Sequence, residues 1–131
     1  MKNLTLLLLI LLFACSSSII TYDELVGEYE AKYREQIQYL SLHRDDTYIY
    51  RYVLDEEQII QTGNWEYEVK EGVVWLTFFR LRLYDPTLSE NVPKIPFSVN
   101  GFWPVVPVKS FSGVIILRSN EEKQYSFKKV S

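Results

Sequence analysis

The amino-acid sequence predicts an all-β protein: a small antiparallel up-and-down barrel, or a strongly curved meander, of about eight strands that follows an N-terminal signal helix. Three observations predict it. Apolar and polar residues alternate with a period of two along much of the chain, as in half-buried strands. Short polar segments separate these runs, and connections of this length join antiparallel neighbours. Only residues 21–40 have the composition of a helix, and there the alternation becomes strand-like from Glu28 onward.

The first fourteen residues have the features of a secretory signal peptide. Lys2 precedes an apolar block from Leu4 to Ala14 that only Thr5 interrupts. A helix needs roughly 20 apolar residues to cross a bilayer, so this block is too short to span one. Residues 1–14 are therefore predicted to be a cleaved signal peptide.

Cys15, the one cysteine of the sequence, follows this block and has no partner for an internal disulfide. Residues Leu12 to Cys15 resemble the bacterial lipobox, whose cysteine is lipidated and becomes the mature N-terminus. The resemblance implies a lipoprotein of the bacterial cell envelope, held to the membrane by acyl chains on Cys15. The alternative is an ordinary secretory signal that is cut elsewhere. Residues 15–21 would form the lipidated cysteine and a flexible leash, and Ser16 favours the outer membrane by the sorting rules of Gram-negative bacteria.

Residues 22–131 are predicted to form a single barrel-like domain, long enough to bury a core without disulfides. The chain of 131 residues has a formal net charge of −3. This mild acidity argues against a nucleic-acid partner, which would require clustered Lys and Arg. It also argues against electrostatic adhesion to anionic lipid, so that attachment to a membrane depends on the anchor.

The elements of this domain are predicted in order along the chain. Thr21 or Asp23 caps a short helical turn that Gly27 ends. Gly27 and Gly63 each stand two residues before an aromatic residue and are predicted to lie where the sheet bends. The run Val73–Phe79 is apolar on both faces and is expected to be deeply covered. The predicted strands are residues 28–33, 36–42, 46–54, 64–70, 73–79, 113–119 and 123–130, and the predicted turns are residues 43–46, 54–57, 70–72 and 119–122.

The segments LVGEYEAKY, LSLHRDDTYIYRY, TGNWEYEVKEGVVWLTFF and GFWPVVPVKSFSGVIIL, with a terminal YSFKK, together resemble a type of small bacterial lipoprotein domain. The sequence departs from that pattern at Asp46, where the pattern has a turn glycine. The resemblance covers most of the mature chain and implies the fold, but no activity. A looser similarity to lipocalin-like barrels implies, by analogy of fold alone, a pocket for a small ligand.

His43 is the only histidine and lies in a predicted turn with Asp45 and Asp46. It could be a general base held by a carboxylate, but a solvated turn residue is the favoured interpretation. The sequence contains no nucleophile elbow and no glycine-rich phosphate loop, and its acidic residues lack the spacing of a calcium loop. We therefore expect no enzymatic activity, no cofactor and no metal site.

Tyr48, Tyr50 and Tyr52 are predicted to project from one face of a strand. Lining a barrel interior, they could hold an apolar ligand and bond to its polar end. The favoured alternative is that they fill the core or form an aromatic ladder between strands.

The segment from Tyr84 to Lys109 contains all five prolines, which predicts mostly loop or edge strand. Its aromatic residues Phe97, Phe102 and Trp103 could form a lid over the barrel mouth or a patch that docks a protein. Alternatively, they tuck into an open end of the barrel and complete the core.

These observations leave three classes of function. The first choice is a membrane-tethered, non-enzymatic interaction module that binds another envelope protein through the aromatic, proline-rich segment, with Phe97 or Trp103 exposed. A lipocalin-like binder of a small apolar ligand comes second and requires a hollow interior. The third is an inhibitor of an envelope hydrolase.

Overall fold

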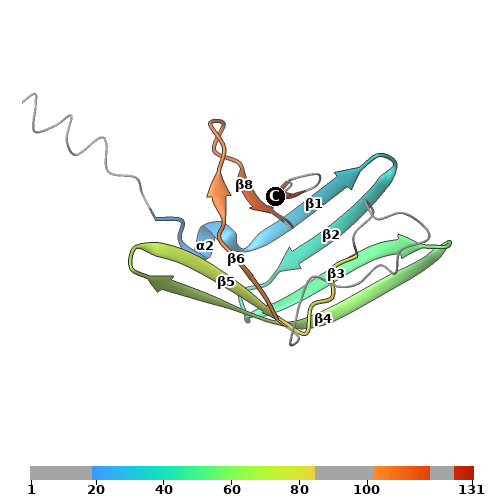
Figure 1. The fold of residues 1–131 in the computed structure, drawn as a ribbon, viewed down its shortest axis with the longest axis horizontal. Helices are drawn as coiled ribbons and strands as arrows, with labels where there is room; N and C mark the ends of the chain where they lie inside the picture. Colours follow the sequence, from blue (N-terminus) through green and yellow to red (C-terminus); the bar gives the residue numbers. More distant parts are fainter. Residues whose placement is uncertain (1–18, 85–101, 119–125) are drawn as a thin grey trace, which may run out of the picture.

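The computed structural model describes residues 19–84, 102–118 and 126–131. The predicted signal peptide, Cys15 and Phe97 lie outside these described residues. The described chain forms one antiparallel sheet of nine strands that curls into a half-barrel, with a single turn of helix at its start (Figure 1). The predicted all-β, strongly curved antiparallel architecture is confirmed.

The helix and strands follow one another as the sequence predicts, with two additional short strands. The helix is α2, Tyr22–Leu25. The strands are β1 (Gly27–Tyr33), β2 (Gln36–Leu42), β3 (Thr47–Leu54), β4 (Glu57–Lys70), β5 (Val73–Phe79), β6 (Phe102–Val105), β7 (Val108–Lys109), β8 (Ile115–Arg118) and β9 (Ser126–Lys129).

The strand order in the sheet is β6-β5-β4-β3-β2-β1-β9-β8-β7, so β1 to β6 form a meander and the last three strands continue from the other side of β1. Strands β6 and β7 lie at opposite edges of the sheet, yet only Val106 and Pro107 separate them in sequence. The chain therefore passes directly from one edge of the half-barrel to the other. Both strands come from the proline-bearing segment, and Pro104 stands in an edge strand, where its missing N–H is tolerated.

Strand β4 is twice as long as the sequence predicts and belongs to both halves of the sheet. Its first half pairs with β3 as far as Asn64, and its second half pairs with β5 from Trp65 onward. Gly63 lies at this junction, where a β-carbon would come within 2.6 Å of the Tyr48 hydroxyl and 2.8 Å of the Phe79 carbonyl oxygen. A glycine is therefore required at this position because two neighbouring strands approach it closely.

The turn between β2 and β3 contains Asp46 in an unusual backbone conformation. Asp46 has φ +65°, the left-handed conformation that glycine adopts most easily. Its carboxylate accepts a hydrogen bond of 2.7 Å from the Tyr22 hydroxyl, and its carbonyl accepts one of 2.8 Å from the backbone of Trp65. Asp46 thus adopts a backbone conformation typical of glycine and adds a side-chain contact that a glycine could not make.

The core lies on the inner face of the sheet, where two segments outside the ladder cover it. Helix α2 begins with a capping box between Thr21 and Glu24, and it buries Leu25. Residues 81–84, directly after β5, run across the same face and bury Leu81 and Leu83. The largest fully buried side chains are Trp65, Tyr29, Tyr48, Tyr50, Phe78, Phe127, Leu25, Leu40, Leu42, Leu76, Leu81 and Leu117.

Candidate functional site

The three tyrosines of β3 lie on the inner face, as predicted, and they form part of the core. Tyr48 and Tyr50 have no exposed surface, and Tyr52 packs at the margin of the core with its ring 5.1 Å from that of Tyr84. The Tyr48 hydroxyl donates a 2.6 Å hydrogen bond to the Phe79 carbonyl. Burial raises the pKa of Tyr48 to about 12, so the hydroxyl stays protonated and available as that donor.

The Tyr50 hydroxyl belongs to a closed network of hydrogen bonds. It donates to the side-chain oxygen of Gln38 and accepts a 3.1 Å bond from the backbone N–H of Tyr84. The Gln38 amide nitrogen in turn donates to the Tyr84 carbonyl at 2.8 Å. These bonds satisfy the polar groups of the inner tyrosine row within the protein itself, which supports the core-filling interpretation over a grip on a ligand.

A second glutamine holds the same segment. The Gln61 side chain donates to the Arg82 carbonyl at 2.8 Å and accepts from the Arg82 N–H at 2.9 Å. Residues 81–84 are therefore bound to the inner face by side-chain amides, which replace the backbone partners of a strand. The space that would be the ligand cavity of a hollow barrel is, along this part of the chain, occupied by the protein itself.

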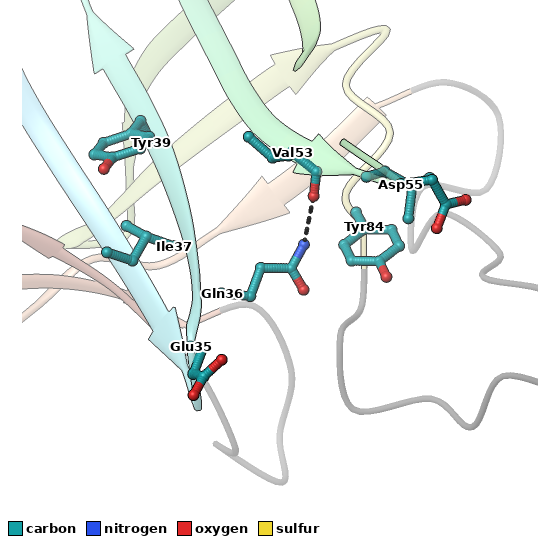
Figure 2. A pocket seen from close by; sticks show the side chains of 8 residues that line it. Glu35, Gln36, Ile37, Tyr39, Val53, Asp55 and Tyr84 are labelled. Atoms are coloured by element: carbon teal, nitrogen blue, oxygen red, sulfur yellow. Dashed lines mark hydrogen bonds between the residues drawn. The ribbon is translucent and has the colours of Figure 1, made fainter. Parts of the chain in front are cut away.

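A groove of about 540 Å³ opens where β2 and β3 separate. Their ladder pairs only residues 39–42 with residues 48–51, and beyond it the Gln36 side chain bridges the gap with a 3.1 Å bond to the Val53 carbonyl (Figure 2). Tyr84 lies between the two strands, and Glu35 and Asp55 stand at the rim (Figure 2). This groove is open and is lined by polar as well as apolar side chains.

The adjacent residues Phe102 and Trp103 point to opposite faces of β6. Trp103 is only 6% exposed, stacks on Phe78 with ring centroids 5.2 Å apart, and lies 6.3 Å from Phe127. Phe102 is 42% exposed. The sequence-based expectation that Trp103 is available for docking does not agree with this burial, because its indole joins β5 and β9 across the inside of the half-barrel. Phe102 remains available.

The outer faces of β5 and β6 carry several exposed apolar side chains, interrupted on β5 by Thr77. Phe79, which is 39% exposed, lies directly opposite Phe102 in the ladder, and Trp75 is 37% exposed. We call this set the outer stripe, and it consists of Val73, Trp75, Phe79, Phe102 and Pro104. The expectation that residues 73–79 are deeply covered is therefore wrong for alternate residues, since only Val74, Leu76 and Phe78 are buried.

The sequence predicts the apolar character of the outer stripe but not its exposure. The apolar residues on both faces of Val73–Phe79 were visible in the sequence, and they show that one face either is covered or binds something. Which of these holds depends on whether another layer of structure packs on that face. In the described residues, helix α2 and residues 81–84 both pack on the inner face.

His43 lies in the β2–β3 turn, where its hydrogen bonds help to hold the turn together. Its carbonyl accepts a 3.1 Å bond from the Trp65 indole, and its ring nitrogen Nδ1 is 3.3 Å from the Thr47 hydroxyl. Asp45 bonds to the side chain and backbone of Thr47, and these bonds lower the pKa of the Asp45 carboxyl. Each of these side chains thus has a partner within the turn, as a turn-stabilising function requires.

Among residues 19–84, 102–118 and 126–131, no group of three or more His, Cys, Asp or Glu side chains is placed to hold a metal ion. Within the same described ranges, no helix is long and apolar enough to cross a bilayer.

No family model, curated protein or solved structure matches this chain.

Proposed function

We propose that this chain is a lipoprotein of the bacterial cell envelope, anchored through Cys15, whose body is a non-enzymatic module for binding another envelope protein. The docking surface is the part of the outer stripe formed by Phe79, Phe102 and Pro104. The signal and lipobox pattern of residues 1–15 supports the anchor, and the exposed aromatic side chains of the folded body support the docking surface.

The observation that carries the docking proposal is the exposed pair of aromatic rings at the edge of the sheet. Phe79 and Phe102 occupy opposite positions on β5 and β6 and are each about two-fifths exposed. Large aromatic side chains contribute most when they are buried at the centre of a protein interface. Among the described strands, β6 also lies at the edge of the sheet, so a partner can approach these rings from the side as well as from above.

Crosslinking in living cells tests this docking surface. A photoactivatable amino acid replaces Phe102 in one variant and Ile60 in the other, since Ile60 is an exposed apolar residue on the outer face of β4. We expect Phe102 to give a discrete protein adduct that Ile60 does not give, and Phe102→Ser to abolish co-purification of that partner. Identical adducts from both positions, or none from either, would contradict the proposal. A cell-wall hydrolase as the partner would identify the chain as an inhibitor.

The anchor is tested separately by labelling with palmitate. The wild-type chain should incorporate the label, and Cys15→Ser should not. Incorporation that is unchanged in Cys15→Ser would remove the basis for membrane attachment through this residue.

A binder of small molecules is the second candidate, and the groove between β2 and β3 is the observation that favours it. Its lining combines Ile37, Tyr39 and Leu54 with polar groups at the rim. A ligand bound there should raise the thermal midpoint of the wild-type protein but not that of Tyr39→Ala, whose side chain lies outside the core cluster. Equal shifts in the two proteins would place binding elsewhere.

A further inference from the structure

The folded body begins very close to the predicted anchor, and its first residues are firmly held. The Tyr67 hydroxyl donates a 2.9 Å hydrogen bond to the Ile20 carbonyl, and Tyr22 stacks on Trp65 with ring centroids 4.9 Å apart. Ile20 is buried. Ile20 and Thr21, which the sequence assigns to the leash, therefore already belong to the body, and Ile19 is the residue at which the described chain leaves it.

The end of the β4–β5 hairpin projects beyond the rest of the sheet on this same side (Figure 1). The pairing of β4 with β3 stops at Asn64, and residues 65–70 continue with β5 alone. Six strand residues extend roughly 20 Å. The bond between Tyr67 and Ile20 places the start of the body against this projecting part.

This hairpin end exposes apolar side chains on both of its faces. Val69 lies on the inner face and is 44% exposed, while Val73 and Trp75 lie on the outer face and are 42% and 37% exposed. Ile19, beside it, is 48% exposed. The turns at the other end of the long strands differ, since they consist of charged residues: Arg34 and Glu35 between β1 and β2, and Asp55 and Glu56 between β3 and β4.

We propose that the end of the β4–β5 hairpin rests in the interfacial layer of the lipid bilayer, with Val69, Val73 and Trp75 in contact with lipid. This inference rests on the proposed function, because it takes acyl chains on Cys15 as the anchor. The four residue-to-residue steps from Cys15 to Ile19 span at most about 14 Å in any conformation. The body is therefore held close to the bilayer at Ile19, and the bond between Tyr67 and Ile20 places the exposed apolar hairpin end next to that point.

The chemistry of the hairpin end fits the boundary between headgroups and acyl chains. Tryptophan favours that layer because its ring is largely apolar and its N–H still finds a polar partner. Lys70 and Glu68 form a salt bridge of 3.3 Å, and Glu71 adds a negative charge at the turn. Attraction to anionic headgroups therefore does not drive the binding of the hairpin end to the bilayer. Apolar contact beside the anchor drives it.

A second apolar turn adjoins the same part of the chain. Phe111 is fully exposed in the turn between β7 and β8. The neighbouring Lys109 bonds to Glu24 of α2 at 2.8 Å, which attaches β7 beside the start of the body. A second hairpin with an exposed aromatic residue is thus attached to the helix that follows Ile19.

Fluorescence of Trp75 tests the proposed contact. The sequence has three tryptophans, and Trp65 and Trp103 are 2% and 6% exposed, so Trp75 is the accessible one. The lipidated protein and its Trp75→Phe variant are reconstituted into phosphatidylcholine vesicles with or without bromine on the acyl chains. We expect bromine to reduce the Trp75 contribution, taken as wild type minus Trp75→Phe, by about two-fold or more, as for a ring at the level of the acyl boundary.

A matched reporter at the far end is the control. Val53 is 56% exposed on the outer face of β3, next to the charged β3–β4 turn. Val53→Trp in the Trp75→Phe background should show no quenching beyond that background. Vesicles that carry the protein but leave Trp75 unquenched, or that quench Val53→Trp equally, would overturn the inference. Flotation of a Cys15→Ser chain made without residues 2–14, as efficient as that of wild type, would instead overturn the anchor, so the two failures are distinguishable.

Discussion

Strands β3 and β5 each carry three aromatic residues, but they distribute them differently between the two faces of the sheet. The aromatic residues of β3 point inward, where Tyr48 and Tyr50 have no exposed surface. On β5, Trp75 and Phe79 point outward and are more than one-third exposed, while the inner positions hold Leu76 and Phe78. The comparison shows that a strand rich in aromatic residues can place them on either face, so their presence does not tell which face belongs to the core.

Hydrogen-bond partners explain why the tyrosines Tyr48, Tyr50 and Tyr52 of β3, which form the inner tyrosine row, face the core while the outer stripe is exposed. A buried tyrosine hydroxyl needs a partner, and Tyr48 and Tyr50 find theirs in the Phe79 carbonyl and the Gln38 side chain. These partners come from residues 38 and 79, which are distant in sequence and meet only in the folded sheet. The inner row therefore depends on tertiary structure, whereas the outer stripe requires only that β5 and β6 pair.

The largest test of this distinction uses two neighbours on β6. Trp103→Ala should lower the free energy of unfolding by about 3–5 kcal/mol, since it removes a buried ring that stacks on Phe78. Phe102→Ala, one residue away on the exposed face, should change it by about 0.5 kcal/mol or less. Denaturant titration of both variants measures the difference. Similar losses from the two substitutions would mean that the outer stripe is covered in solution.

Gly63 tests the contact between β3 and β5 directly. Gly63→Ala should cost about 1–3 kcal/mol, because the added carbon would displace the Tyr48 hydroxyl from the Phe79 carbonyl. The cost should be smaller in a Tyr48→Phe background, where the hydroxyl is absent. Part of it should remain there, since the Phe79 carbonyl oxygen is also within 2.8 Å. A cost that is the same in both backgrounds would show that the clash is not with the Tyr48 hydroxyl but with the Phe79 carbonyl oxygen and the Tyr48 ring carbon Cζ, each 2.8 Å away.

The sequence predicts the fold class well because its two signals, alternation and short polar turns, are local. Most strands and the bend at Gly63 follow from them. The first half of β4 was missed because Gln58, Ile59, Ile60 and Gln61 do not alternate, although the pairing of β4 with β3 orders them. The placement of β6 and β7 at opposite edges depends on closure of the whole sheet, which no local pattern encodes.

The candidate site shows the same limit. The shared face of Tyr48, Tyr50 and Tyr52 is a local property and was predictable. The exposure of Trp75 and the burial of Trp103 were not, because both depend on which face residues 81–84 and helix α2 cover. The sequence of residues 81–84 does not predict where they lie in the fold. The side chains of Gln38 and Gln61 hold them in place.

Alkaline pH should weaken the inner row selectively. Because burial raises the pKa of Tyr48 to about 12, the folded protein keeps this proton at a pH where the unfolded chain, with a tyrosine pKa near 10, loses it. The contribution of Tyr48 to stability is therefore complete below pH 10 and declines as the pH rises through 12. Tyr48→Phe should be less stable than wild type by about 1 kcal/mol at pH 8, through loss of the hydrogen bond.

Denaturant titrations of wild type and Tyr48→Phe from pH 8 to pH 12 measure this dependence, and subtracting one from the other removes the titration of other groups. The difference in stability should narrow above pH 10. A constant difference would mean that the Tyr48 hydroxyl titrates as it does in water and that the inner row is accessible.

The one stabilising change concerns the turn that keeps the tyrosines of β3 facing inward. A shift of one residue in the pairing of β3 with β4 would turn the tyrosine row to the outer face, so the turn at Asp55 and Glu56 determines which face is the core. Both residues have positive φ, +51° and +65°, as in the type I′ turns for which Asn-Gly is preferred.

The double substitution Asp55→Asn with Glu56→Gly should therefore relieve backbone strain and raise stability by roughly 1 kcal/mol. Asp55→Asn with Glu56→Ala, which removes the same charges but keeps a β-carbon at position 56, should give little or none of this gain. If the alanine variant gained as much as the glycine variant, the benefit would come from lost charge repulsion, and the turn would not be the strained element that fixes the inner and outer faces.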